Sequence, residues 1–261
     1  MSRLADKVIR MSGKKNVFDI KNVSLSKMGV NKYGGKSCYL NYNGDKSPLY
    51  LRLPTMKLTF NLCSYVDESK PDAKPKYWAV MSFNGMDENE KLKECYDKLK
   101  SLDNFMIEQG IKHSKEWFKK KKNRVQIEEN YNPIIRQDDE QKYAPKFGKV
   151  SFRIDIKNPS QFNCTFYSGK SKMEGDEVSI QTLSKQMVRG TEILGLIQCT
   201  GVYFVGGTKF GLSWVFKQAK LTFPPRFDEY VLGSDDEDED EQLEVNQVED
   251  SETESESESE D

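Results

Sequence analysis

The sequence contains little of what most enzymes, membrane proteins and secreted scaffolds depend on. It has one histidine, His113, and five scattered cysteines with no CxxC pair among them. No apolar run reaches the ~18 residues of a membrane-spanning helix, and no GxGxxG or GxxxxGK[ST] segment is present to hold a nucleotide phosphate. We therefore expect a soluble, unanchored protein with reduced thiols, no cofactor and no metal site.

Catalysis has equally few candidates. His113 lies in a lysine-rich stretch just before an expected helix, which is typical of an exposed surface residue rather than of a general base. Asp138 and Asp139 belong to a loop with charges of both signs, where carboxylates are ordinarily solvated. No local motif marks a nucleophile. The sequence predicts a protein that is not an enzyme.

Positive charge is missing from the segment beyond Gly233. Residues 234–261 hold 16 of the 42 Asp and Glu and no Lys or Arg, so residues 1–233 keep 26 acidic residues against 40 Lys and Arg. The body therefore has a net charge of +14 and the tail one of −16. A body this basic suits a polyanion such as nucleic acid, and a tethered acidic segment suits competition for the same surface.

The chain is expected to have three parts. These are a basic mobile arm over residues 1–15, one domain over 16–233, and an acidic tail over 234–261 whose Ser/Glu-rich composition predicts disorder. Short alternating apolar runs predict strands at 38–42, 49–53, 56–60, 77–83, 149–156 and 162–167. Gly206 and Gly207 are expected to turn a hairpin between 193–205 and 209–223. The domain is therefore mainly β, a small barrel or sandwich.

A helical segment over about 88–124 is expected to interrupt the strands. Asp87 and Glu90 fit a capping box, and apolar residues at helical spacing predict a helix over 88–109 that ends near Gly110. Ser114 would cap a second short helix carrying Trp117 and Phe118. Residues 128–145 are polar and predict a long loop, and a further short helix is expected around 183–189.

The predicted strands carry basic and aromatic residues on one side. Alternate strand residues face opposite sides, so apolar series such as Val150, Phe152 and Ile154 are expected to face the core, as are Met56 to Phe60 at every second position. Exposed tyrosines can stack bases, while lysine and arginine follow phosphates. We predict nucleic-acid contacts from Tyr39, Tyr50, Arg52, Lys57, Lys149, Arg153, Tyr167, Lys209 and Lys217.

Each of these assignments has an ordinary structural alternative, because any β protein exposes tyrosine and lysine. Trp214 alternates with Leu212 and Phe216, which favours a place in the core. The basic run Lys119 to Lys122 fits a solvated loop as well as a phosphate contact. A one-residue shift in register would exchange every inward and outward position.

One segment carries a family resemblance. The stretch Gly201-Val-Tyr-Phe-Val-Gly-Gly-Thr-Lys-Phe-Gly-Leu-Ser-Trp214 resembles the hairpin of the single-stranded-DNA-binding proteins of large nucleocytoplasmic DNA viruses. The Trp117-Phe118 helix end and the segment Tyr143-Ala-Pro145 are similar to that family as well. The resemblance implies an OB-like barrel that coats single-stranded DNA during viral DNA replication, repair or recombination. It also implies replication proteins as partners of the tail, and it is compatible with a homodimer.

These observations predict a single-stranded-DNA-binding protein that acts largely without sequence preference and whose tail competes for the site and docks partners. RNA is a second candidate ligand, and no membrane partner is expected. The expected location is inside the cell, in a cytoplasmic viral factory or the nucleus, or in the virion. Two other classes stay open: a histone-chaperone-like protein whose tail binds basic partners, and a virion structural protein.

Overall fold

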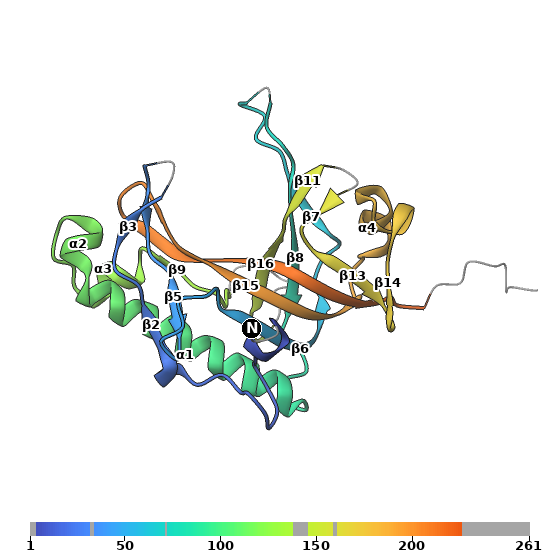
Figure 1. Ribbon diagram of the computed structural model, residues 1–261, viewed down its shortest axis with the longest axis horizontal. Helices are drawn as coiled ribbons and strands as arrows, with labels where there is room; N and C mark the ends of the chain where they lie inside the picture. The colour runs from blue at the N-terminus through green and yellow to red at the C-terminus, as the bar shows by residue number, and fades with distance from the viewer. Residues whose placement is uncertain (1–3, 32–33, 71, 138–145, 159–160, 226–261) are drawn as a thin grey trace, which may run out of the picture. The chain divides into compact units, whose positions relative to one another are not determined.

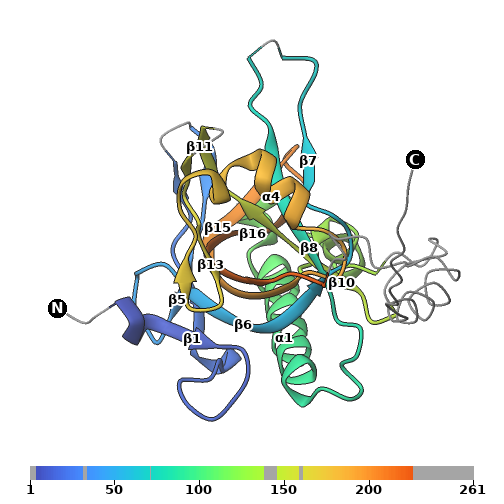
Figure 2. The same cartoon turned by 90° about the vertical axis from the view of Figure 1, so that its right-hand side faces the viewer.

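Five strands close into a barrel. In the computed structural model, which describes residues 4–31, 34–70, 72–137, 146–158 and 161–225, the barrel strands lie between residues 50 and 222. They are β6 (Tyr50–Leu58), β8 (Lys76–Ser82), β10 (Lys149–Ile154), β15 (Glu192–Val205) and β16 (Lys209–Thr222). Figure 2 shows these strands curving around the barrel, with the long helix α1 (Glu90–Lys112) beside them.

The strand pairings define the type of barrel. β6 pairs with β15, β15 with β16, β10 with β8, and β8 returns to β6, all antiparallel, while β10 and β16 are parallel. Lys57 and Leu58 lie opposite Ser82 and Met81 at the closing pair. The fold is therefore a mainly β, OB-like five-stranded barrel with added helices, in agreement with the predicted fold class.

The strand β6 follows the predicted alternation with one interruption. Leu51, Leu53, Met56 and Leu58 are buried, but Pro54 is buried as well, directly after Leu53. The ladder between β6 and β15 shifts register at this level: Leu194 lies opposite Thr55 and Leu196 opposite Arg52, so β6 has one extra residue between them. Such a bulge accommodates Pro54, which has no N–H to donate to the ladder. The two strands expected at 49–53 and 56–60 are consequently one, and Phe60 lies beyond its end, 42% exposed instead of in the core.

Helix α1 forms where the spacing of apolar residues predicted it. Its cap differs from the prediction, because Asn89 accepts hydrogen bonds from the backbone N–H groups of Lys91 and Leu92. The helix also continues through Gly110 to Lys112. A Cβ at Gly110 would lie 2.8 Å from Phe210 Cζ, so this glycine permits close packing of the helix on β16 rather than ending the helix.

Short elements complete the described chain. Three further α-helices are α2 (Ser114–Phe118), which starts at Ser114 without a side-chain cap, α3 (Arg124–Glu128) and α4 (Ile180–Gln186). Three short 3-10 helices are η1 (Leu4–Lys7), η2 (Ile20–Asn22) and η3 (Gly175–Val178). The minor strands are β1 (Val8–Arg10), β2 (Val23–Leu25), β3 (Gly29–Val30), β4 (Lys36–Ser37), β5 (Leu40–Tyr42), β7 (Cys63–Tyr65), β9 (Tyr131–Asn132), β11 (Ile156–Asn158), β12 (Gln161–Phe162), β13 (Thr165–Ser168) and β14 (Ser171–Lys172).

The N-terminal segment departs from its prediction as a mobile arm. From Leu4 it is folded, and β1 pairs in parallel with β6, placing Val8 opposite Tyr50 and Arg10 opposite Arg52. Met11 is fully buried. Backbone pairing and an anchored apolar side chain hold residues that composition alone assigned to an arm. The predicted acidic tail, 234–261, and Asp138, Asp139 and Tyr143-Ala-Pro145 of the predicted loop lie outside the described residues.

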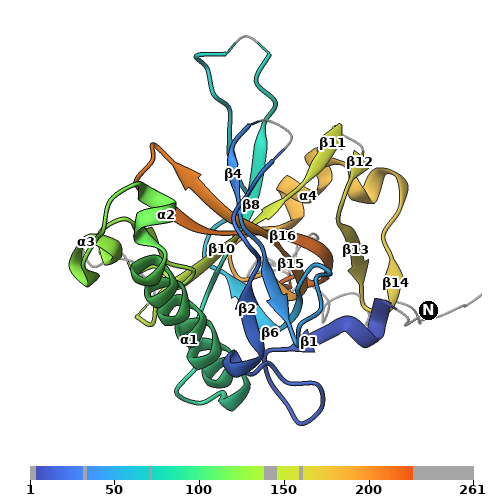
Figure 3. The ribbon, with the colours of Figure 1, turned by 60° about the vertical axis from the view of Figure 1, so that its left-hand side comes forward.

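Three hairpins project from the body of the fold (Figure 1). One joins β3 and β4, a second joins β7 and β8, and the third is the turn between β15 and β16. Gly206 and Gly207 make that last turn with φ values of 59° and 70°, as predicted. Figure 3 shows β4 crossing the β15–β16 pair, and the bridge between Cys38 and Val202 lies just after β4 in the chain.

Candidate nucleic-acid interface

The outer surface of β8 and β10 combines aromatic, polar and basic side chains. The ladder between them places Arg153 opposite Trp78, Ser151 opposite Val80 and Lys149 opposite Ser82. The intervening residues, including Met81 and Phe152, are buried inside the barrel. In an OB-fold the second and third barrel strands, which are β8 and β10 here, carry the surface that binds oligonucleotides.

Two adjoining hollows lie over this surface and form what we call the groove. They measure about 370 Å³ and about 510 Å³ and share Arg153, Tyr203 and Ser213 in their walls. β8 and the segment 132–136 line the first hollow, and the β3–β4 hairpin lines the second. The groove therefore runs between parts of the chain that are far apart in sequence.

The groove is basic. Its lining residues include Lys36, Lys76, Arg136 and Arg153, and none of the described residues that line it is acidic. Arg153 Nη2 lies 3.9 Å from Asp155 Oδ1, but both side chains are about half exposed, at 48% and 40%. An exposed pair at this separation is weak, so the Arg153 guanidinium keeps most of its attraction for an anion.

Two tyrosines of the groove rest on glycines. A Cβ at Gly211 would lie 2.6 Å from Tyr203 Oη, and one at Gly201 would lie 3.2 Å from Tyr39 Cδ1. Asn132 Nδ2 also donates a hydrogen bond to Tyr203 Oη. Tyr39 is 51% exposed. Each ring is thus supported from below by backbone, an arrangement that suits a platform for stacking a planar group.

A buried carboxylate fixes one wall of the groove. Asp103 on α1 accepts hydrogen bonds from Tyr131 Oη at 2.7 Å and from the backbone N–H groups of Ile134 and Ile135 at 2.8 and 3.4 Å. Burial raises the pKa of Asp103 above its ordinary value, and burial also raises the pKa of Tyr131. The segment that presents Asn132 and Arg136 to the groove is thereby tied to the helix.

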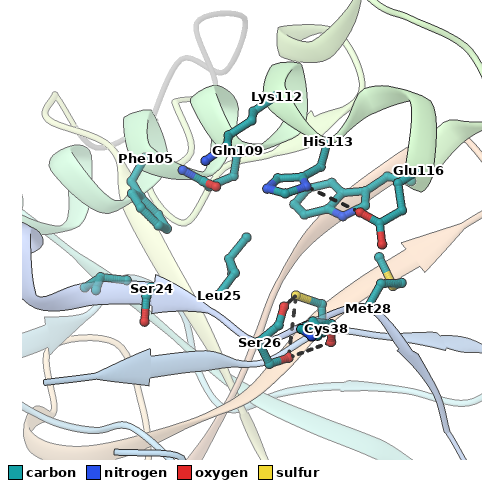
Figure 4. A pocket seen from close by; sticks show the side chains of 13 residues that line it. Ser24, Leu25, Ser26, Met28, Cys38, Phe105, Gln109, Lys112, His113 and Glu116 are labelled. Carbon is teal, nitrogen blue, oxygen red and sulfur yellow. Dashed lines mark hydrogen bonds and ion pairs between the residues drawn. The ribbon is translucent and has the colours of Figure 1, made fainter. Parts of the chain in front are cut away.

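The opposite wall, formed by the β3–β4 hairpin and Cys38, is attached to β15 and to α2. The Val202 N–H of β15 donates to Cys38 O at 2.7 Å. The Lys36 ammonium donates to two backbone carbonyls of α2, those of Glu116, at 3.1 Å, and Trp117. Behind this wall is a separate cavity of about 560 Å³, where side chains of β2 and the segment up to Cys38 face α1 (Figure 4). Burial raises the pKa of the Cys38 thiol there.

Trp214 is buried, as predicted, at 5% exposure, and packs edge-on against Phe152 with ring centroids 6.4 Å apart. Its indole Nε1 has no hydrogen-bond partner within the described parts of the chain, although the residue lines the first hollow. A buried donor without an acceptor is costly.

The structure separates the predicted contact residues into several groups. Tyr39 and Arg153 share the groove, while Lys57 and Lys149 lie farther along the same outer surface, both opposite Ser82. The other five are elsewhere. Tyr50 and Arg52 lie on β6 beside β1, Tyr167 is half-buried on β13, Lys209 begins β16 at its turn, and Lys217 is half-buried at a register shift in β16.

Sequence reasoning missed Trp78, Lys76, Arg136, Lys36 and Tyr203 of the groove. The strand that holds Trp78 reads Lys-Tyr-Trp-Ala-Val-Met-Ser, so its apolar run has no polar face by which to orient it. Tyr203 stood inside the hairpin motif without an assigned role. His113, predicted to be an exposed surface residue, is only partly exposed and stacks on Trp117 with ring centroids 5.7 Å apart. The cysteines lie mostly in the core, as predicted: Cys38, Cys95, Cys164 and Cys199 are buried, and Cys63 is half-buried.

Neither metal-ligand clusters nor spanning helices occur among the residues that the structure describes. No group of three or more His, Cys, Asp and Glu there could hold a metal ion. Within the same residues, every helix is too short or too polar to cross a membrane.

Comparison with known proteins returned matches among solved structures. No family model matches the sequence, and no curated protein matches it. The single-stranded DNA-binding protein of bacteriophage Enc34 in complex with ssDNA is similar, with 10% sequence identity and a TM-score of 0.40. The match covers 69% of this chain and 89% of that chain. The single-stranded DNA-binding protein gp2.5 of bacteriophage T7 is similar at 9% identity, 70% and 98% coverage and a TM-score of 0.41.

Proposed function

We propose that this protein binds single-stranded DNA, largely without sequence preference, in the groove over β8 and β10. The observation that carries the proposal is the register pair Trp78 and Arg153 at the centre of a basic groove on the outer face of an OB-like barrel. An unpaired strand exposes both its bases and its phosphates, and this groove offers groups for both.

The division of labour follows from the side chains. Tyr39, Tyr203 and Trp78 present rings on which bases stack, each worth ~1–3 kcal/mol by alanine substitution. Arg153, Arg136 and Lys76 neutralise phosphates and release counterions, which gives a log–log salt slope of about −0.7 per phosphate for single strands. Because stacking uses the face that every base has, binding of this kind discriminates little between sequences.

The proposal extends to a biological setting. The resemblance of the hairpin Gly201 to Trp214 supports a role in replication, repair or recombination of the DNA of a large nucleocytoplasmic DNA virus. The protein would act in a cytoplasmic factory or the nucleus, or travel in the virion, and would bind without catalysing a reaction. The proposal also includes a homodimer and RNA as a second ligand. A measurement of the oligomeric state tests the first, and a titration with RNA tests the second.

The acidic tail would regulate the groove. Residues 234–261 carry a charge of −16 against +14 on the rest of the chain. A tethered segment has an effective concentration on the order of mM at its own body, so at low salt it would occupy basic surface until DNA displaces it. Once displaced, it would be free to dock replication proteins.

Fluorescence-anisotropy titration tests both parts. Labelled single strands, matched duplex and RNA are titrated with the full chain and with a chain truncated after Gly233, over a range of salt concentrations. We expect preference for the single strand over duplex, and tighter binding without the tail at low salt. Binding that is absent, or equal for single strand and duplex, would contradict the function. Unchanged affinity after truncation would contradict the tail's role alone.

A further inference from the structure

The outer face of the barrel carries a second group of cations, located around an exposed ring. Phe60 is 42% exposed, and the Lys149 Nζ atom lies 5.4 Å from its ring centroid. A hollow of about 570 Å³ lies beside this ring, lined also by Lys57 and Arg189. We call Phe60, Lys57, Lys149 and Arg189 the end cluster.

Strand register makes the end cluster continuous with the groove. Lys149, Ser82 and Lys57 lie side by side across β10, β8 and β6. Arg153 and Trp78, which line the groove, form a parallel row four residues farther along β10 and β8. Ser151 and Val80 are the row between them. Four residues of extended strand span ~13 Å, several times the ~3.4 Å rise per nucleotide of a stacked strand. The two places can therefore hold different nucleotides.

The three cations come from separate parts of the fold. Lys57 lies on β6, Lys149 on β10, and Arg189 follows α4, where its backbone N–H donates to Asn61 Oδ1 at 3.0 Å. Lys57 Nζ is 3.8 Å from Glu192 Oε1 with its side chain 69% exposed, a weak pair. Arg189 forms no ion pair with any described residue, and no acidic residue is among those described as lining the hollow.

The end cluster fits a nucleotide. Its exposed aromatic ring offers a stacking surface, and its cations lie around that ring and the hollow beside it. A single nucleotide supplies both a π-face and a negative charge. A partner protein would need an aromatic and an acidic side chain at the same spacing.

We propose that the end cluster is a second binding position for the same DNA strand. The strand leaves the groove along β10, a base stacks on Phe60, and Lys57, Lys149 and Arg189 hold the adjoining phosphates. This inference rests on the proposed function, since it extends the same binding path. Its consequence is a length requirement, because only a strand that spans both places reaches full affinity.

A length series measures that requirement. Oligothymidylates from about 4 to about 16 nucleotides, the range of site sizes of OB folds, are titrated with the full chain and with Phe60→Ala, Arg189→Ala and Arg153→Ala variants. Lys93→Ala, which removes an exposed lysine of α1, is the matched control. Phe60→Trp, unlike Phe60→Ala, keeps an aromatic ring at this position. Because Phe60 is exposed, these changes should preserve the fold, and urea unfolding midpoints verify that.

We expect Phe60→Ala to weaken binding of the longer oligonucleotides about 5-fold to about 150-fold, the range for loss of one stacked base. The shortest oligonucleotides should bind unchanged, and Phe60→Trp should restore the longer ones. An equal loss at all lengths would place Phe60 in the primary site and overturn the second position. No loss at any length, while Arg153→Ala still weakens binding, would overturn the end cluster alone. If Arg153→Ala also had no effect, the proposed function itself would fail.

Discussion

The ring of Tyr203 lies against the backbone of Gly211 so closely that a Cβ at Gly211 would be 2.6 Å from Tyr203 Oη and 2.8 Å from Tyr203 Cζ. Gly211 pairs with Asn132 of β9, whose side chain holds the same phenol oxygen. One glycine therefore sets both the height of the ring above β16 and the approach of the neighbouring strand. The position of this stacking surface depends on the absence of a side chain rather than on a contact made by one.

Gly211→Ala should consequently weaken DNA binding. The added methyl group displaces Tyr203, and loss of one stacking position costs ~1–3 kcal/mol of binding free energy. Anisotropy titration measures it. In a Tyr203→Ala background the same substitution should cost less, because the two changes act on one ring.

Gly29→Ala is the control, since a Cβ there would meet only ordinary contacts, the nearest at 3.5 Å. Equal losses from Gly211→Ala with and without Tyr203 would show that the glycine acts on something else, such as the pairing of β9.

Arg153 should contribute measurably to the salt dependence of binding. Its guanidinium is shared by both hollows of the groove and is held only weakly by Asp155, 3.9 Å away. Arg153→Ala should reduce affinity for single strands and lower the magnitude of the log–log salt slope by about 0.7 for each phosphate that the arginine neutralises in the wild type. Titrations at several salt concentrations give the slope. With Lys93→Ala the slope should stay as in the wild type, and an unaltered slope for Arg153→Ala would mean that this arginine binds no phosphate.

Local patterns predicted which side of a strand faces the core, but not which strands meet. The alternation in β6 and β10 correctly placed Arg52, Lys57 and Arg153 outside. The choice between barrel and sandwich depended on the pairing of Lys57 with Ser82, which no local pattern encodes. Likewise, Tyr39 and Arg153 share the groove only because the Cys38–Val202 bridge brings the N-terminal segment to the β15–β16 hairpin.

Two misassignments have specific physical causes. Phe60 continues the every-second-residue pattern of Met56 and Leu58, but the strand ends before it, so its ring turns outward. Gly110 resembles a helix terminator in sequence, whereas in the fold it is the contact point of α1 with Phe210. A glycine chosen for the space it leaves cannot be told from one chosen for its φ angle until its neighbours are known.

Gly110→Ala should therefore destabilise the protein, although alanine is the better helix former by ~1 kcal/mol. The new Cβ would lie 2.8 Å from Phe210 Cζ and 2.9 Å from Ile127 Cγ2, both in the core, and overpacking of this kind typically costs ~1–3 kcal/mol. Urea unfolding gives the difference in free energy. In a Phe210→Leu background, which lacks that Cζ atom, the same substitution should cost less. A Gly110→Ala protein more stable than the wild type would show that α1 moves away from β16 at little cost.

Replacing Asp103 by alanine should weaken both the fold and DNA binding. Asp103→Ala removes every acceptor that Tyr131 Oη and the backbone N–H groups of Ile134 and Ile135 use, and leaving buried donors unpaired costs ~1–3 kcal/mol. Affinity for DNA should fall as well, since Arg136 and Asn132 stand on the segment that Asp103 holds. Urea unfolding and anisotropy titration measure the two effects. Full DNA affinity in a destabilised Asp103→Ala protein would show that the segment keeps its place without this carboxyl group.

Asp103 should also make stability depend on pH in the opposite sense to an ordinary surface carboxylate. Burial raises its pKa above the usual 3.8, so the folded protein protonates it more readily than the unfolded chain does. The stability that it contributes is complete below the unfolded pKa and is lost as the pH rises through the folded pKa. Asp103→Asn keeps the Oδ1 acceptor that Tyr131 Oη and the backbone N–H of Ile134 share, loses the Oδ2 acceptor of the Ile135 N–H, and does not titrate. We expect the free energy of unfolding of the wild type, relative to this variant, to fall as the pH rises from about 3.8, measured by urea unfolding at a series of pH values. A constant difference between the two proteins across the series would mean that the carboxyl group has the same pKa in the folded and the unfolded protein. Its three hydrogen bonds would then offset the cost of burying its charge.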